Sequence, residues 1–222
     1  MKTGLGFSRN SKFHAIFATS SIPQAITYYR LLKAKIKDEK LDLKITALFD
    51  ANIDNGGGVA FKEDGLVEII EDYNEQYEQD FSLANFPKLE KDIASRLAHK
   101  KPYINIEKET NKQIDLLIVV DQMLTGFDSK WINTLYLDKM LEYANVIQAF
   151  SRTNRLFGTD KPFGTIRYYR KPHTMEENIN KAIKLYSGDK PLGLFVDRLE
   201  DNLKSLIVFM ARLMNFFAML EW

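Results

Sequence analysis

The chain of 222 residues contains no cysteine, which excludes a disulfide framework, thiolate ligands for zinc and a cysteine nucleophile. It also has almost no net charge, because 31 Lys and Arg residues against 30 Asp and Glu residues leave +1. No overall electrostatic field therefore attracts nucleic acid or acidic lipid, and any basic surface must be local. The lack of cysteine favours an intracellular protein, and we expect a cytoplasmic one.

Long apolar runs are absent as well. The first 13 residues lack the apolar core that defines a secretion signal. The last twenty residues are apolar, but Lys204, Arg212 and Asn215 interrupt a run that would need about 18 uninterrupted residues to span a bilayer. We therefore expect a buried helix there and no membrane partner. At 45% hydrophobic and 27% charged residues, the composition is typical of a globular protein with one large domain or a domain with an appendage.

Short apolar segments alternate with segments of helical periodicity. The apolar segments predict strands at residues 13–18, 45–49, 116–120, 134–137 and 165–169. Between them, helical spacing predicts helices from Ser21 to about Lys37 and over residues 66–77, 88–99 and 144–155. This order predicts an α/β fold with a doubly wound, mostly parallel sheet flanked by helices. Beyond residue 172 only helices are expected, at 175–186 and 197–222, so we predict a domain over residues 1–172 and a helical region over 173–222.

Three patterns imitate functional sites but fail on their details. Residues 6–13 resemble a phosphate-binding loop, yet Ser11 precedes the lysine where glycine is required and Phe13 follows it where a hydroxyl is required. Residues 50–61 resemble a calcium loop, but Asn55 and Phe61 occupy its glycine and glutamate positions. The three histidines, at positions 14, 99 and 173, have no second ligand at a suitable spacing. We therefore predict no metal site, and expect surface or core histidines.

Two segments together point to nucleotide chemistry. Gly126 and Asp128 follow a buried strand, where ligand-binding loops of open parallel sheets lie. Gln148, Arg152 and Arg155 are spaced i, i+4 and i+7, which would place them on one face of a helix. Two guanidinium groups and an amide on one face could hold nucleotide phosphates, although ion pairs with Asp and Glu would explain the face as well. Residues 168–171 form an aromatic and basic patch that suits either nucleic acid or a solvated edge strand.

The amino-acid sequences of three blocks resemble a known family. LTGFD at 124–128 and QAFSRTNR at 148–155 resemble motifs V and VI of superfamily 2 helicases and translocases. FHAIFATSSIPQAITYYRLLK at 13–33, DLLIVVDQMLTGFDSKWINTLYLDK at 115–139 and NVIQAFSRTNRLFG at 145–158 resemble the motor of the restriction subunit of type I restriction-modification enzymes. The match covers most of residues 1–170 and is loose in the acidic stretch between the blocks. Ser151 departs from the glycine that many superfamily members have before the first arginine.

The resemblance implies that the chain is the second RecA-like domain of a DNA-translocating motor, followed by the start of a helical region. The family's nuclease domain and first RecA-like domain, whose Walker motifs hold ATP and magnesium, would be partners in the same parent chain. Other partners would be duplex DNA and the modification and specificity subunits. By itself the chain is expected to bind no cofactor and to be inactive.

The same resemblance assigns candidate roles to individual residues. Arg152 and Arg155 would act in ATP hydrolysis, Gly126, Asp128 and Gln148 would contact ATP, and Ser20 and Thr125 would contact the DNA backbone. Two alternatives stay open: a repair or remodelling helicase of the same superfamily, and a non-catalytic doubly wound binding or scaffold domain.

Overall fold

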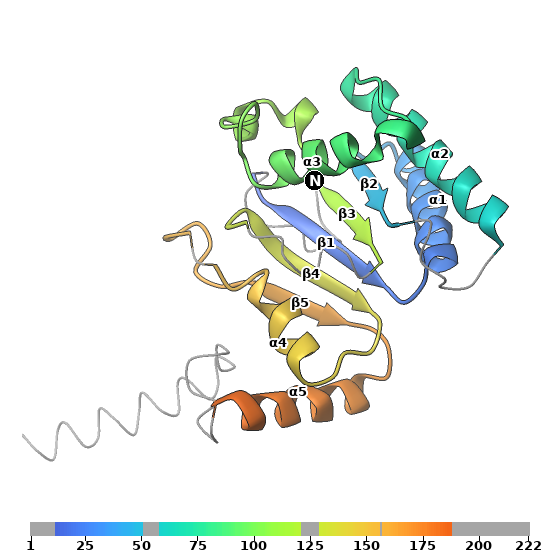
Figure 1. Cartoon of the computed structure of the whole chain (residues 1–222). Coiled ribbons are helices and arrows are strands. Elements are labelled where there is room, and N and C mark those ends of the chain that lie inside the picture. The colour runs from blue at the N-terminus through green and yellow to red at the C-terminus, as the bar shows by residue number, and fades with distance from the viewer. Residues whose placement is uncertain (1–11, 51–57, 121–128, 156, 188–222) are drawn as a thin grey trace, which may run out of the picture. The chain divides into compact units, whose positions relative to one another are not determined.

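The computed structural model describes residues 12–50, 58–120, 129–155 and 157–187. In these ranges five strands form one sheet that is parallel throughout, in the order β2-β3-β1-β4-β5 (Figure 1). The strands are β1 His14–Thr19, β2 Ile45–Leu48, β3 Leu116–Val119, β4 Ile132–Asp138 and β5 Thr165–Tyr168. The predicted α/β class and RecA-like arrangement are confirmed, and the five predicted strands are present with shifts of one or two residues at their ends.

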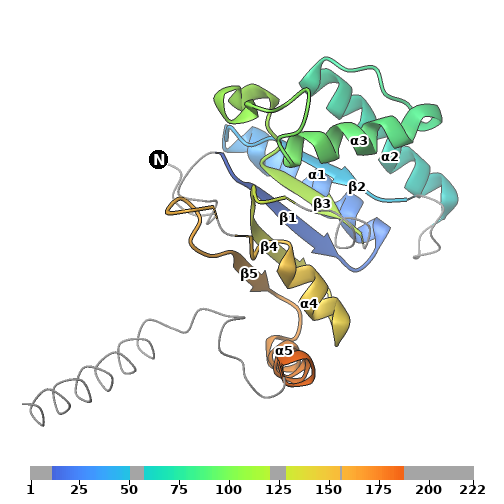
Figure 2. The ribbon, with the colours of Figure 1, turned by 60° about the vertical axis from the view of Figure 1, so that its left-hand side comes forward.

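Helices cover both faces of the sheet. They are α1 Ile22–Asp38, α2 Val59–Tyr77, α3 Phe86–Leu97, α4 Ala144–Ser151 and α5 Pro172–Ser187, with short 3-10 helices at Leu83–Asn85, Ile106–Lys108 and Thr110–Lys112. Figure 2 shows α1 behind the sheet and α3 and α4 in front of it. Strands covered on both faces bury successive side chains, which explains why β3 is an unbroken apolar run with all four residues buried.

The start of α1 follows from its sequence. Ser21 has extended backbone angles, and its hydroxyl accepts a hydrogen bond from the backbone N–H of Gln24 at 3.4 Å. Pro23 lies in the first turn, where its missing N–H leaves no intrahelical bond unmade. The helix then buries Ala25, Ile26 and Tyr29 at helical spacing. The predicted start of this helix at Ser21 is confirmed, with Ser21 as its N-cap.

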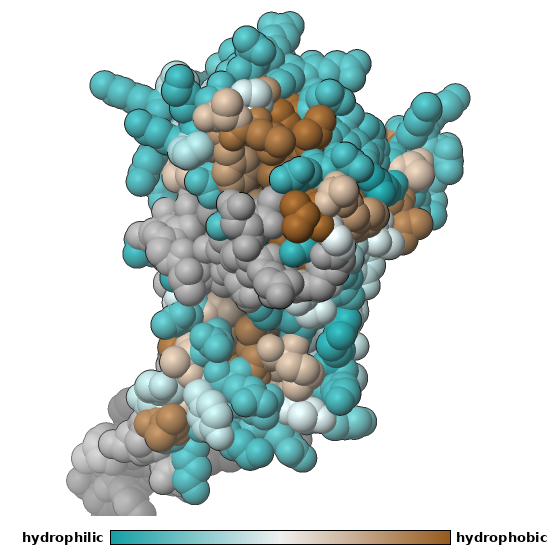
Figure 3. All heavy atoms as spheres, turned by 45° about the vertical axis from the view of Figure 1, so that its right-hand side comes forward, coloured by the Kyte–Doolittle hydropathy of each residue, from teal (hydrophilic) through white to brown (hydrophobic). Residues whose placement is uncertain are grey.

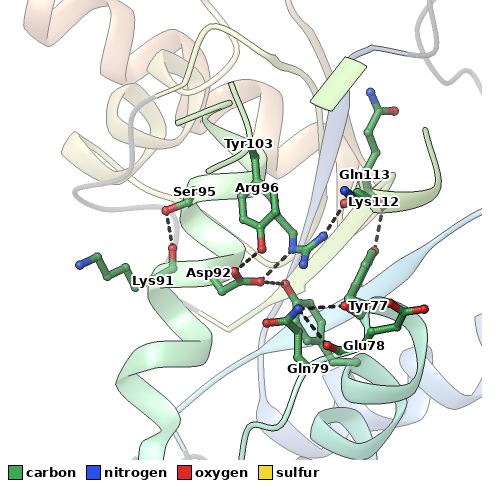
Figure 4. A network of polar contacts seen from close by, with 11 residues as sticks. Tyr77, Glu78, Gln79, Lys91, Asp92, Ser95, Arg96, Tyr103, Lys112 and Gln113 are labelled. Atoms are coloured by element: carbon green, nitrogen blue, oxygen red, sulfur yellow. Dashed lines mark hydrogen bonds and ion pairs between the residues drawn. The ribbon is translucent and has the colours of Figure 1, made fainter. Parts of the chain in front are cut away.

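A buried arginine fixes α3 to its neighbours (Figure 4). The Nε of Arg96 donates to Asp92 at 2.8 Å, and its Nη1 donates to the backbone carbonyl of Lys112 at 2.8 Å. The guanidinium lies 4.2 Å from the ring centroids of Tyr77 and of Tyr103. The buried charge thus has an ionic partner, a carbonyl acceptor and two aromatic faces, which is how a protein tolerates an arginine away from water.

The chain divides into two compact units, residues 1–182 and 183–222. Within the first, Met175 and Ala182 of α5 are buried, and the Asn178 amide donates to the carbonyl of Leu141 at 3.0 Å. The predicted boundary near residue 172 falls at the start of α5. The predicted helix at 197–222 lies outside the described residues. In the described ranges, no helix has the length and apolarity that crossing a membrane requires.

Exposed apolar side chains on α1 and α2 include Leu31, Val59, Phe61 and Val67. Figure 3 brings the α1 and α2 side of Figure 1 forward and shows apolar surface in brown among polar residues in teal. Exposed apolar residues are common in folded proteins, so this surface alone indicates no function.

Candidate functional site

Ser20 lies at the carboxyl end of β1, on the exposed turn into α1. Its hydroxyl donates to the Gln24 side-chain carbonyl at 2.6 Å, and its backbone N–H donates to the same oxygen at 3.1 Å. The side chain of Gln24 therefore holds Ser20 in place. A hydroxyl at this edge of the sheet is placed to contact a phosphate, and its role in DNA binding stays a prediction.

Asp138, the last residue of β4, joins the elements around Ser20. Its Oδ2 accepts hydrogen bonds from the Gln24 amide and the Tyr28 hydroxyl, each at 2.7 Å, and its two oxygens accept from Arg170 at 3.2 and 3.3 Å. Partial burial works to raise the pKa of Asp138, but hydrogen bonds from Arg170 and Tyr28 outweigh it and hold the pKa below its usual range. The carboxylate therefore stays charged at neutral pH. Sequence reasoning missed both Asp138 and Gln24.

The residues of the aromatic and basic patch at 168–171 have different surroundings in the structure. Arg170 is engaged by Asp138, whereas Tyr169 is 57% exposed and stacks on Tyr136 with ring centroids 6.4 Å apart. The arginine of the patch is therefore already part of an ion pair.

Helix α4 is shorter than predicted, which corrects the placement of Arg155. The predicted helix runs to Arg155, but α4 ends at Ser151 and Arg152 is its C-cap. Side-chain hydroxyl groups compete with backbone N–H groups for the last carbonyls of the helix. The Ser151 hydroxyl donates to the backbone carbonyl of Gln148 at 2.7 Å, and the Thr153 hydroxyl donates to that of Phe150 at 3.2 Å. Gln148, Arg152 and Arg155 therefore do not share one helical face. Gln148 is an exposed residue of α4, and Arg155 lies beyond the helix.

Lys161, on the loop beyond Arg155, is buried with 1% of its surface exposed. The Lys161 ammonium donates to the carbonyl of Ile132 at 2.6 Å and to that of Lys130 at 3.1 Å. Burial first, and then the positive charge of Arg155, lower the pKa of Lys161 to about 8. The Lys161 charge is thus held where β4 begins, within electrostatic reach of Arg155. Nothing in the sequence pattern distinguished Lys161 from the other lysines.

The candidate residues lie at two ends of the sheet. In the pairing of β1 with β4, Thr19 lies beside Asp138 and His14 lies beside Ile132. Ser20 is therefore at the carboxyl end, whereas the Arg155–Lys161 pair is at the amino end. The remaining candidates, Gly126, Asp128 and Thr125, lie outside the described residues.

The amino end also contains a histidine contact that the sequence did not predict. The Nε2 atoms of His14 and His99 are 2.9 Å apart, and His99 stacks on Trp131 with ring centroids 3.8 Å apart. Both histidines are buried, as expected of core residues. Among the described residues there is no group of three His, Asp or Glu side chains that could hold a metal ion.

Comparison with known proteins identifies the family. Residues 11–171 match the family described as type I restriction enzyme subunit R domain 3. The chain belongs to this family. An endonuclease subunit of a type I restriction enzyme from Staphylococcus saprophyticus is 37% identical over 207 residues, covering 91% of this chain and 21% of the relative. One from Staphylococcus aureus is 36% identical over 186 residues, covering 82% of this chain and 19% of the relative.

The chain thus spans about a fifth of the length of these relatives. A shorter match links it to the N-terminal part of a putative type I restriction endonuclease subunit of Mycoplasma pneumoniae, 48% identical over 69 residues that cover 31% of this chain and 18% of the relative. The range matched by the R subunit family contains all five strands, Ser20, both candidate arginines and Lys161, and it ends just before α5.

Proposed function

We propose that this chain is the second RecA-like domain of the ATP-dependent, DNA-translocating motor in a type I restriction endonuclease subunit. The observation that carries the proposal is Arg155, an exposed arginine on the loop that the Lys161 ammonium joins to the backbone where β4 begins. Positive potential of this kind suits the phosphate oxygens of a nucleotide. Membership of the R subunit family and the resemblance of residues 148–155 to motif VI support the same function.

ATP would be bound mainly by the first RecA-like domain of the parent chain, together with magnesium. We assign no magnesium ligand to the described residues. Arg152 and Arg155 would contact ATP once the two domains close, with Gln148, Gly126 and Asp128 lining the same cleft. Phosphoryl transfer places negative charge on the equatorial phosphate oxygens, and an arginine supplied from a second domain contributes roughly 10³–10⁵ in rate. Supplying the arginines from a moving domain would couple hydrolysis to domain closure.

DNA would be contacted by Ser20, at the opposite end of the sheet from the arginines, and by Thr125. The carboxyl ends of parallel strands are a usual position for ligand-binding loops, and hydroxyl and amide groups there can bind backbone phosphates without reading sequence. Under the proposal, the modification and specificity subunits are partners of the complete enzyme, and the nuclease domain lies in the same parent chain.

The test is steady-state ATP turnover of the full-length subunit, assembled with its partner subunits and DNA, as Arg152→Ala and Arg155→Ala variants. We expect turnover to fall by about 10² or more in each while the melting temperature stays nearly constant. Arg30→Ala is the matched control, because Arg30 forms an exposed ion pair with Glu68 on α1 and α2. Methylation of the same DNA should persist. Near-normal turnover in both arginine variants would refute the proposal.

A further inference from the structure

The arginine that follows α4 lies on a loop that closes on itself. At the far end of this loop, a Cβ atom on Gly164 would lie 2.3 Å from the backbone oxygen of Thr153, so the two ends of the loop touch and only glycine fits. Inside the loop, Phe157 and Lys161 exchange backbone hydrogen bonds of 3.0 and 3.3 Å. Arg155 is therefore positioned by a closed loop and not by the helix that the sequence predicts.

Lys161 attaches this loop to the sheet. Its ammonium crosses from the loop to the carbonyls of Lys130 and Ile132, which lead into and begin β4. Two further contacts add to this attachment: the ion pair of Lys12 with Asp160, and the packing of the half-buried Phe157 on Trp131 with ring centroids 4.7 Å apart. Among these contacts, the Lys161 ammonium is the buried polar one, so it constrains the loop most closely.

A lysine is an unfavourable residue for this position unless its ammonium group makes hydrogen bonds that an apolar side chain could not make. Burial and the neighbouring Arg155 both oppose its charged form, as the lowered pKa records. An apolar side chain of similar length would fill the same volume without that free-energy cost, but it would leave the buried carbonyl of Ile132 and the part-buried carbonyl of Lys130 without this donor.

We propose that Lys161 is a positioning residue for Arg155, fixing the arginine-bearing loop on the first residues of β4 so that the guanidinium meets the nucleotide in one geometry. The inference rests on the proposed function of Arg155. Lys161 itself touches no substrate. Its effect on ATP hydrolysis passes through Arg155 and therefore disappears when Arg155 is absent.

A double-mutant cycle in the full-length, assembled enzyme tests this directly. Lys161→Met should lower kcat for ATP hydrolysis by about 10-fold or more and change KM for ATP by less than about 3-fold, because an interaction made in the transition state is lost. In the Arg155→Ala background, Lys161→Met should cause no further loss of kcat, since residues that act as a unit are not additive. A lysine that serves only the fold would instead give the same factor in both backgrounds.

Tyr77→Phe is the control for lowered stability, because it removes a buried hydrogen bond to the Gln113 carbonyl on another part of the chain. It should lower the melting temperature and leave kcat unchanged. Gly164→Ala is a second variant that disturbs the loop through its closure with Thr153. Its loss of kcat should also vanish in the Arg155→Ala background.

The outcomes separate the inference from the proposed function. Normal turnover of Arg155→Ala refutes the proposed function and the inference with it. If Arg155→Ala lowers kcat but Lys161→Met does not, the inference is wrong and the proposed function stands. The same holds if the losses of kcat in the two single variants add up in the double variant. If Lys161→Met does not fold, Gly164→Ala decides by the same cycle. If neither folds while Tyr77→Phe does, the loop serves the fold alone and the inference is wrong.

Discussion

At the scale of single residues, the contact between His14 and His99 links the stability of the chain to pH. The Nδ1 of His14 lies 2.6 Å from the carbonyl oxygen of Ile114, which can only accept, so Nδ1 carries the proton and Nε2 accepts from His99. Burial, and then the neighbouring His99, lower the pKa of His14 to about 3. The folded state therefore keeps this imidazole neutral in a range where the unfolded chain protonates it.

The sign of the pH effect follows from these protonation states. Above about pH 6.5 both states are neutral, and between about 6.5 and 3 only the unfolded state binds the proton. The free energy of unfolding should thus fall on acidification, by about 1.4 kcal/mol per pH unit from His14. Urea unfolding at pH 7.5 and 5.0 measures how much the free energy of unfolding falls on acidification. This fall should be about 2 kcal/mol smaller in His14→Gln than in the unchanged chain. His173→Gln, at an exposed position, is the control. Equal losses in His14→Gln and the unchanged chain would contradict this account.

Residues that depend on distant partners could not be predicted from the sequence. Lys161 bonds with a carbonyl 29 residues earlier, and Gln24 bonds with Asp138, which is 114 residues away. Each looks like an ordinary polar residue in its local sequence. By contrast, Arg152 and Arg155 could be nominated because they are close in sequence and stand in a recognisable motif. The structure leaves their roles as predictions.

At the scale of elements, the strands could be predicted and the end of α4 could not. The strands are short apolar runs because the sheet is covered on both faces, and that signal is local. The end of α4 depends on hydroxyl groups that take carbonyls from the backbone and on Gly164 packing against Thr153 from across the loop. Periodicity continues through Arg155 although the helix does not.

The start of α1 offers two neighbouring serines with different expected functions. Ser21 caps the helix, whereas Ser20 is exposed and proposed to contact DNA. Ser21→Ala should lower the free energy of unfolding by about 1 kcal/mol and leave DNA affinity of the assembled enzyme unchanged. Ser20→Ala should weaken DNA binding several-fold and leave its salt dependence unchanged, because a neutral hydroxyl releases no counterion, with a smaller change in stability. Binding titrations at two salt concentrations and chemical unfolding check both; the reverse pattern would remove Ser20 from the DNA contact.

At the scale of the whole molecule, the sheet separates the two proposed activities. Because all described strands are parallel, every strand presents its carboxyl end on the side of Ser20 and its amino end on the side of Lys161. The sequence could predict the parallel class from alternating strands and helices. It could not predict that the arginines would return to the amino end, since that depends on where α4 ends and how its loop closes. The domain can thus present DNA contacts and ATP contacts on different sides.

The proposed division of the ATP site between two RecA-like domains predicts that the chain alone should fold but hydrolyse no ATP. The groups proposed to bind the triphosphate and magnesium belong to the first RecA-like domain, and residues 6–13 fail the requirements of a phosphate-binding loop. An arginine can stabilise the transition state only when another domain presents the nucleotide to it. The measurement is phosphate release by the purified chain, with and without duplex DNA, beside the assembled enzyme. A DNA-stimulated rate that co-purifies with the chain and disappears in Arg155→Ala would show that the site is complete within these 222 residues. The division of labour between two RecA-like domains would then be wrong.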